Sequence, residues 1–172
     1  MLYYGEYNTF LGCNSANYGG VLYLNSYMSL YEEFYVVYGY NYAEYGGTVY
    51  CLNCDTVALE SPLFEYNAAF QASSLFLDYD SNYKSDYTYI DVYIISFNIT
   101  NLLSMLDGGF MYFNGKNVNV GLEIISNSIL SVESNTYTGS LSKISNAYET
   151  TSKVSGGGFI IVECNNIPYL TV

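Results

Sequence analysis

Short apolar runs separated by turn residues dominate the first half of the chain. Between residues 21 and 39, three such runs are Val21–Leu24, Met28–Tyr31 and Phe34–Tyr38, and they are bounded by Asn25-Ser26 and Gly39. Runs of this length, rich in aromatic and branched residues and bounded by Asn, Ser or Gly, are typical of β-strands. No amphipathic stretch of ten or more residues has the period of a helix. The pattern predicts an all-β chain.

An internal repeat organises these runs. The ten residues 14–23 recur in register at 41–50, and again in degraded form at 67–76. Gly-Gly pairs begin at 19, 46, 108 and 157, and Ala-Ser takes the equivalent place at 72. The successive steps of the repeat are therefore 27, 26, 36 and 49 residues. Three short strands in about 27 residues match one coil of a right-handed parallel β-helix, in which coils stack about 4.8 Å apart. We predict five to six such coils with two polar insertions.

Stacked coils place equivalent residues in columns. We expect one aromatic-rich column, and a second column of asparagines at a turn, where side-chain amides pair along the axis. Paired glycines permit tight corners with positive φ. The first column comprises Tyr23, Tyr50, Phe76, Tyr112 and Ile161, the second Asn14, Asn41 and Asn67, and the corner glycines are Gly19, Gly20, Gly46, Gly47, Gly108, Gly109, Gly157 and Gly158.

The longer steps of the repeat indicate insertions within a single domain that spans residues 1–172. Regular coils occupy 1–77, a polar insertion occupies 78–88, and coils resume over 89–133. A Ser/Thr-rich insertion follows over 134–155, and the last coil occupies 156–172. Both insertions are expected to project from corners between strands, where loops are tolerated.

Two tetrapeptides carry a resemblance to a known family. Gly-Gly-x-(Leu/Val) begins at Gly19 and Gly46, and similar Gly-Gly segments begin at Gly108 and Gly157. Phe-x-x-Asn is intact at 64–67 and degenerate at 11–14 and 38–41. The repeat resembles that of the polymorphic outer membrane proteins and their adhesin-like relatives, well over residues 1–113 and loosely beyond. It also looks like the Gly-Gly coils of large ciliate surface proteins. It departs from the bacterial family in its excess of Tyr and in bulkier residues after Gly-Gly. The resemblance implies a β-helical, extracellular, adhesive or structural protein, and it supplies no catalytic residues.

The four cysteines leave several alternatives open. Cys51 and Cys54 form a Cys-x-x-Cys pair, which suits a redox motif, half a zinc site or a local disulfide. A zinc site needs two more ligands, and Cys13 and Cys164 lie far away in the sequence. A redox motif favours a helix N-terminus, and nothing helical follows. A structural disulfide or buried free thiols remain.

One polar segment partly matches a calcium-binding loop. Asp78, Asp80, Asn82 and Asp86 occupy positions 1, 3, 5 and 9 of such a loop. The Gly at position 6 and the Glu at position 12 are absent. Calcium is therefore the one cofactor that the sequence suggests, against the simpler interpretation of a solvated loop.

Asn98 lies in the only Asn-x-Ser/Thr sequon, Asn98-Ile99-Thr100. Such a sequon is an acceptor for N-linked sugar in a secreted chain. We therefore predict a glycoprotein modified at Asn98.

Charge and composition exclude several classes of function. The chain has 16 acidic residues, 4 basic residues and no His, so its net charge is −12. Binding to nucleic acid needs clustered basic residues, and His-based relays or metal sites need His. No uninterrupted apolar stretch approaches the roughly 18 residues of a membrane-spanning helix. Few charged residues (12%) and 23 Tyr favour an extracellular or cell-surface location, as a mature or excised part of a larger protein.

No group of residues in the sequence indicates a particular reaction. A polysaccharide lyase needs calcium-binding acids beside an Arg or Lys base, and a glycosidase needs two spaced carboxylates. An ice-binding face needs recurring Thr, which the repeat lacks. We predict no enzymatic activity.

The favoured function is a structural subunit that stacks end to end into a filament. The alternatives are an adhesin segment that binds glycans or proteins and, more distantly, a polysaccharide-active enzyme. A rival to the filament is a segment cut from a longer β-helix.

Overall fold

The computed structural model describes residues 2–25, 29–33, 35–80, 83, 90–106, 108–129, 132–134, 137–139, 148–150, 160–166 and 170–171. All regular structure in these ranges is β, which confirms the predicted all-β class. The strands are β1 (Leu2–Glu6), β2 (Thr9–Leu11), β3 (Leu22–Asn25), β4 (Ser29–Glu33), β5 (Val37–Gly39), β6 (Tyr42–Tyr45), β7 (Val49–Leu52), β8 (Thr56–Glu60), β9 (Leu63–Glu65), β10 (Ala68–Gln71), β11 (Leu75–Asp78), β12 (Ile90–Thr100), β13 (Leu102–Ser104), β14 (Met111–Ile129), β15 (Val132–Ser134), β16 (Tyr137–Gly139), β17 (Tyr148–Thr150), β18 (Ile160–Asn166) and β19 (Leu170–Thr171).

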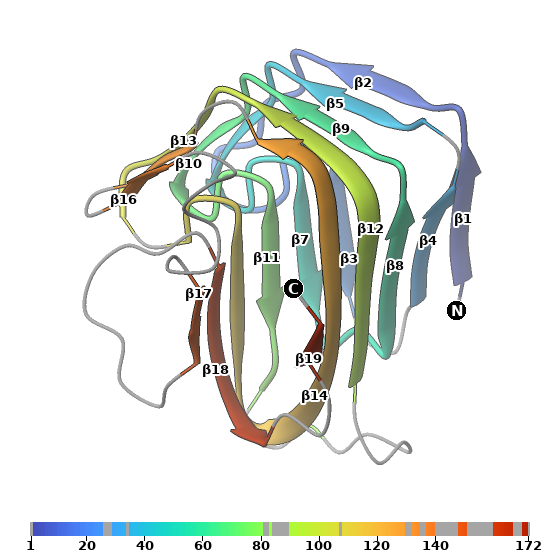
Figure 1. Ribbon diagram of the computed structural model, residues 1–172, viewed down its shortest axis with the longest axis vertical. Coiled ribbons are helices and arrows are strands. Elements are labelled where there is room, and N and C mark those ends of the chain that lie inside the picture. Colours follow the sequence, from blue (N-terminus) through green and yellow to red (C-terminus); the bar gives the residue numbers. More distant parts are fainter. Residues whose placement is uncertain are drawn as a thin grey trace.

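The strands form a curled, mostly parallel sheet (Figure 1). From β1 to β14, each strand pairs with the strand that lies one sequence repeat later. Tyr23 of β3 pairs with Tyr50 of β7, and the same row continues through β11, β14 and β18. The pairing steps of this row are those of the sequence repeat, because like residues must meet for like side chains to stack. Among the described strands, only the β15–β16 pair is antiparallel.

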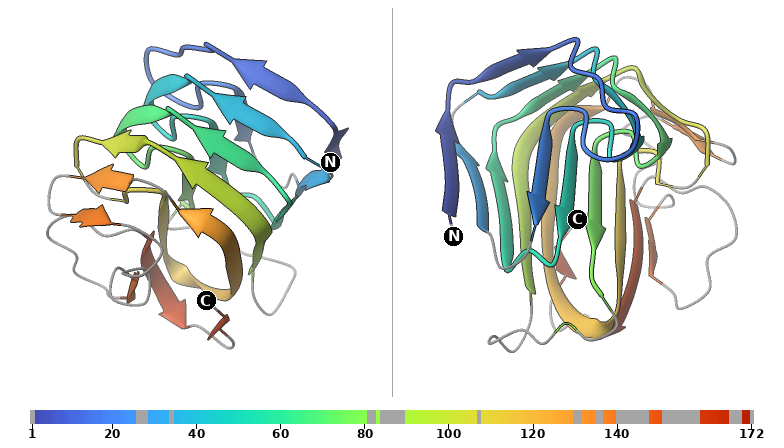
Figure 2. Two further views of the ribbon diagram at one scale, coloured as in Figure 1. Left: turned by 45° about the horizontal axis from the view of Figure 1, so that its top comes forward. Right: turned by 180° about the vertical axis from the view of Figure 1, so that it is seen from behind.

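Each regular repeat contains four strands, not the predicted three. The additional strand is β6, which pairs with β10 in a separate five-stranded sheet (Figure 2). This segment begins with Asn41, which led us to expect a turn there. It is a strand because Ala43 is small enough to be fully buried between its neighbours, while Tyr42 faces outward. The long strands β12 and β14 each bend and contribute to two rows of strands.

Residues in the left-handed region of φ turn the chain at the corners. Gly19, Gly46 and Gly108 have φ of +56°, +64° and +69°, and Ala72 takes the equivalent place in the third repeat with +58°. A second corner also uses non-glycine residues, namely Tyr7, Tyr35, Ser61 and Ser96. Equivalent positions of successive repeats therefore share their backbone conformation, even where the residue type differs. The predicted corner residues Gly157 and Gly158 lie outside the described residues.

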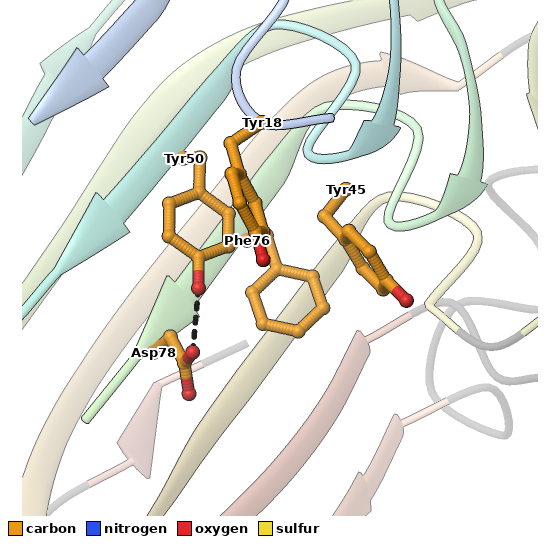
Figure 3. Close-up of a pocket in the computed structure, with 5 residues that line it drawn as sticks. All are labelled: Tyr18, Tyr45, Tyr50, Phe76 and Asp78. Carbon is orange, nitrogen blue, oxygen red and sulfur yellow. Dashed lines mark hydrogen bonds between the residues drawn. The ribbon is translucent and has the colours of Figure 1, made fainter. Parts of the chain in front are cut away.

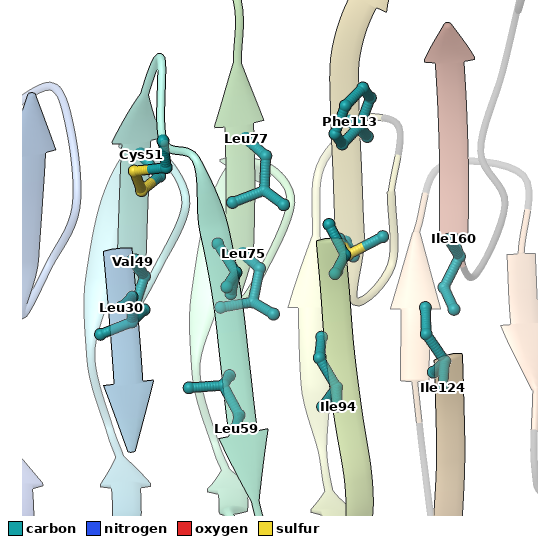
Figure 4. Packing of buried hydrophobic residues seen from close by; sticks show 14 of the residues in the cluster. Leu30, Val49, Cys51, Leu59, Leu75, Leu77, Ile94, Phe113, Ile124 and Ile160 are labelled. Atoms are coloured by element: carbon teal, nitrogen blue, oxygen red, sulfur yellow. A yellow bond between two sulfur atoms is a disulfide. The ribbon is translucent and has the colours of Figure 1, made fainter. Parts of the chain in front are cut away.

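The core lies inside the curl, where alternate residues of each strand point inward (Figure 4). One row of fully buried residues runs through Val49, Leu75 and Ile160. Two rows face it, one through Leu30 and Val57 and the other through Leu59 and Ile94. An internal column of rings joins Phe10, Tyr38 and Phe64, with centroids 5.5 and 5.3 Å apart. In the described part of the chain, stacked like residues thus fill the interior, and no helix covers the sheet.

Cys51 and Cys54 form a disulfide at the corner between β7 and β8. Both sulfur-bearing side chains are fully buried, and Asn53 between them adopts a left-handed φ of +57°. Cys13 and Cys164 are half-buried and take no part in this disulfide. Of the alternatives for the Cys-x-x-Cys pair, the structure therefore contains the local disulfide. Because this bond is buried, we interpret it as a structural crosslink.

Removing this disulfide is expected to lower the free energy of unfolding by about 2 kcal/mol, the chain-entropy value for such a short loop. The measurement is urea denaturation of the Cys51→Ala/Cys54→Ala protein. A Cys13→Ala protein is the control, and it should stay within about 0.5 kcal/mol of the parent. Equal stability of the double variant and the parent would contradict a structural role for the bond.

Candidate ligand-binding site

Two columns of aromatic side chains meet on the outer face of the sheet at the Gly-Gly corner. Tyr18 and Tyr45 come directly before the glycines, and their rings stack with centroids 5.6 Å apart. Directly after the corner, Tyr23, Tyr50, Phe76 and Tyr112 occupy equivalent positions on β3, β7, β11 and β14. The centroids of these successive rings are 5.6, 5.3 and 5.2 Å apart, and the interplanar angles are 12–19°. The predicted aromatic positions therefore share one column, which ends at Ile161.

This outer column is mostly shielded from solvent although it faces away from the core. Tyr50 and Phe76 are only 5% and 6% exposed, whereas Tyr23 at the end of the column is 48% exposed. Tyr23 has a stacked neighbour on only one side, because β3 ends its row of strands. The ring of Tyr18 also meets Tyr23 at a tilt of 41°, and the rest of the Tyr23 side chain is exposed at the edge of the sheet.

A small hollow of about 140 Å³ lies between the two columns. Its walls are the rings of Tyr18, Tyr45, Tyr50 and Phe76, and the carboxylate of Asp78 lies beyond the Tyr50 hydroxyl (Figure 3). Tyr18 contacts Tyr50 with ring centroids 4.5 Å apart, and Tyr45 meets Phe76 edge to face at 5.5 Å. The left-handed glycines of the corner bring both columns to the same outer face.

Hydrogen bonds fix the Asp78 carboxylate. The hydroxyl of Tyr50 donates to Oδ2 at 2.5 Å, and the Asn114 amide donates to Oδ1 at 2.8 Å. Burial and this bond to Asp78 both raise the pKa of Tyr50 far above its ordinary value of 10.0. Burial also raises the pKa of Tyr45, with a further contribution from the charge of Glu44. The hollow thus combines neutral phenol rings with one carboxylate.

The predicted calcium ligands are only partly described. Asp78 bonds to Tyr50 and Asn114, and Asp80 exchanges two hydrogen bonds of 2.9 Å with the side chain of Asn53. Asn82 and Asp86 lie outside the described residues. Within the described ranges, no three acidic, His or Cys side chains converge on one point. Calcium binding by this segment remains a prediction.

The predicted asparagine column needs a correction. Asn41 and Asn67 are buried and adjacent, but Asn14 is exposed and pairs with Tyr42. Cys13 takes the place that we expected for Asn14, because the first repeat is one residue longer on this side: its β2–β5 step is 28 residues. The amides also do not pair with one another. Each Oδ1 accepts a backbone N–H of the preceding repeat, from Cys13 to Asn41 and from Asn41 to Asn67.

Asn98 lies within β12, between Leu63 of β9 and Ser128 of β14. Its side chain is half-buried, on the opposite face of the strand from the fully buried Phe97 and Ile99. An acceptor on the face of a sheet is less accessible than one on a loop. Glycosylation at Asn98 remains a prediction.

Sequence analysis did not identify Tyr18, Tyr45 or the carboxylate of Asp78 as parts of one site. The signal was present for the two tyrosines, since both precede Gly-Gly and recur in register with the repeat. No sequence pattern links Asp78 to Tyr50, because the pair depends on how consecutive strands stack.

Comparisons with protein families, curated proteins and solved structures give no match to this chain. The described residues also contain no helical segment with the length and hydrophobicity that a membrane crossing requires. The case for function therefore depends on the geometry of the chain itself.

Proposed function

We infer that the chain is a parallel β-helix with four strands in each coil, right-handed like nearly all parallel β crossovers. The inference is supported by parallel pairs at nearly one step on every side of the curl. These steps are 27 residues for β1–β4, 28 for β2–β5 and 26 for β6–β10. The resemblance of the Gly-Gly repeat to polymorphic outer membrane and adhesin-like proteins agrees with this fold.

We further propose that the protein is an extracellular structural subunit that stacks end to end into a filament. The observation that carries the proposal is the edge formed by β1, β2 and β3, which we term the open edge. These three strands each end a row, and no other described strand pairs with their outer sides. Unpaired backbone groups on parallel edge strands favour addition of another strand.

Side chains at the open edge also favour association. Tyr23 and Phe10 end the outer and inner aromatic columns, and each stacks on a ring of the next repeat, Tyr50 and Tyr38 respectively. Leu2, Tyr4 and Leu11 are 59%, 51% and 56% exposed on the same three-strand edge. A second copy stacked on this edge would extend the aromatic columns and pair the edge strands.

Electrostatic repulsion opposes this association. Each copy has a net charge of −12, and its charges act over about 10 Å at 0.1 M salt and about 3 Å at 1 M. Raising the salt concentration should therefore strengthen stacking, because salt screens the repulsion between copies and does not weaken the apolar contacts.

We expect the 172-residue protein to sediment as a monomer at low salt and as larger assemblies at 1 M NaCl and high protein concentration. The Leu11→Pro variant tests the edge. Asn8 and Gly12 bond to the neighbouring repeat, so by alternation along β2 the N–H of Leu11 points outward, where Pro is tolerated on an edge strand. Tyr66→Ala is the control, since Tyr66 is exposed at a corner away from β1, β2 and β3. Leu11→Pro should stay monomeric while Tyr66→Ala assembles. A monomer of the parent protein under all conditions would contradict the proposal.

Adhesion is the second candidate function, favoured by the aromatic hollow at the Gly-Gly corner. Aromatic faces bind sugars and apolar groups alike. An adhesin segment would bind its partner as a soluble monomer, without self-association.

A further inference from the structure

The hollow between Tyr18, Tyr45, Tyr50 and Phe76 has the chemistry of a cation site. The faces of aromatic rings carry negative partial charge and attract cations within about 6 Å of the centroid. Three of the four rings are phenols, and the Tyr50 hydroxyl donates to Asp78, which shifts electron density onto its ring. The only full charge among the lining residues is the negative charge of Asp78.

The Asp78 carboxylate keeps capacity for a ligand. An ionised carboxylate offers about four lone-pair positions, and Tyr50 and Asn114 occupy one on each oxygen. Lys116 is the single lysine in the described ranges, and it pairs with Glu163 at 3.1 Å instead. Within the described residues, the carboxylate therefore has no cationic partner.

Charge and size together select the ligand. The net charge of −12 and the neighbouring Glu44 repel anions from this corner. A bare metal ion would require several oxygen ligands, and the lining residues supply one carboxylate. The volume of about 140 Å³ is well below that of sites for drug-sized ligands, which hold roughly 300–1,000 Å³. A small organic cation fits these three limits.

We propose that the hollow binds an organic ammonium group, with the rings of Tyr18, Tyr45, Tyr50 and Phe76 around its alkyl substituents and Asp78 as counter-ion. The ammonium can belong to a free quaternary amine or to a lysine side chain of a partner protein. The proposal is independent of filament formation, because it depends only on residues of one copy.

The test is titration of the 172-residue protein at low salt, where copies repel one another, followed by NMR of the tyrosine rings. Tetramethylammonium is the main probe, tert-butanol is a neutral probe of similar shape, and N-acetyl-lysinamide represents a partner's lysine. Methyl glucoside tests for sugar binding. We expect saturable binding of tetramethylammonium at millimolar concentrations and at least about tenfold weaker binding of tert-butanol. Tighter binding of N-acetyl-lysinamide than of tetramethylammonium would assign the ammonium to a partner, and the reverse order would assign it to a free amine.

Three variants locate the site. Tyr18→Ala should weaken tetramethylammonium binding at least about fivefold by removing one wall, and Asp78→Asn should weaken it about tenfold by removing the charge. Tyr66→Ala should leave binding unchanged, since Tyr66 is as exposed as Tyr18 (44% and 43%) but does not line the hollow. Circular dichroism establishes that each variant is folded.

Several results would overturn the proposal. These are equal binding of tert-butanol and tetramethylammonium, binding of methyl glucoside alone, absence of saturable binding to the folded parent protein, and unchanged binding by folded Tyr18→Ala and Asp78→Asn. None of these results bears on sedimentation at high salt, so failure of this site and failure of the filament proposal are distinguishable.

Discussion

Replacing Asn67 by Ala is expected to lower the free energy of unfolding by about 4 kcal/mol. The fully buried Asn67 side chain accepts the backbone N–H of Asn41 at 3.0 Å and donates to the carbonyl of Tyr38 at 2.8 Å. Alanine removes both of these hydrogen bonds and leaves a cavity where the amide was. Each buried polar group that loses its partner costs about 1–3 kcal/mol. Urea denaturation followed by circular dichroism measures the loss.

Two matched variants separate this effect from the mere loss of an amide. Asn41→Ala should cost less than Asn67→Ala, because its partners Cys13 and Phe10 are only partly buried. Asn14→Ala should stay within about 0.5 kcal/mol of the parent, since its side chain is exposed and makes one long bond of 3.3 Å to Gly12. Equal losses at all three positions would refute the account of the stacked asparagines.

Gly47→Ala is expected to destabilise the protein by more than about 3 kcal/mol. A Cβ atom at this position would overlap the carbonyl oxygen of Ser73 and lie 2.6 Å from that of Ala68. Both obstacles are backbone atoms of the next repeat, so a side chain cannot move to relieve the overlap. Forcing strands apart in a packed interior costs about 1–3 kcal/mol for one added methylene, and more where backbone must move. Thermal and urea unfolding of the variant test this value.

Gly12→Ala is the matched control for the glycine prediction. Gly12 has a left-handed φ of +66°, but a Cβ atom there would meet nothing within 4 Å. Its cost should be about 1 kcal/mol, the penalty for L-residues in the left-handed region. A larger loss for Gly12→Ala than for Gly47→Ala would mean that backbone conformation, and not close stacking of repeats, requires the glycines.

Much of the strand arrangement could be predicted because the repeat records it. The steps between Gly-Gly pairs are the steps between paired strands, and Tyr23, Tyr50, Phe76 and Tyr112 share a column because stacked strands bring like residues together. The strand β6 was not predicted, because Asn41, directly before it, is typical of a turn. The strand conformation of β6 depends on hydrogen bonds to the neighbouring repeat, which a single segment does not reveal.

The position of Asn14 shows why one repeat could not be aligned from sequence identity alone. Asn14 and Asn41 are identical residues in the sequence alignment of the repeats, but the structure pairs Phe10 with Tyr38 and Cys13 with Asn41. Stacking of the two rings, at 5.5 Å, decides the register over the match of two asparagines. The candidate site was also beyond sequence analysis, because it joins Asp78 to residues 28 or more positions earlier through strand stacking.

Electron cryo-microscopy of the protein assembled at 1 M NaCl tests the central claim most directly. The account predicts filaments in which the strands β1, β2 and β3 of each copy pair with the next copy at about 4.8 Å, with the ring of Tyr23 stacked across the joint. Dispersed single copies, or assemblies whose contacts leave the β1, β2 and β3 edge uncovered, would contradict it.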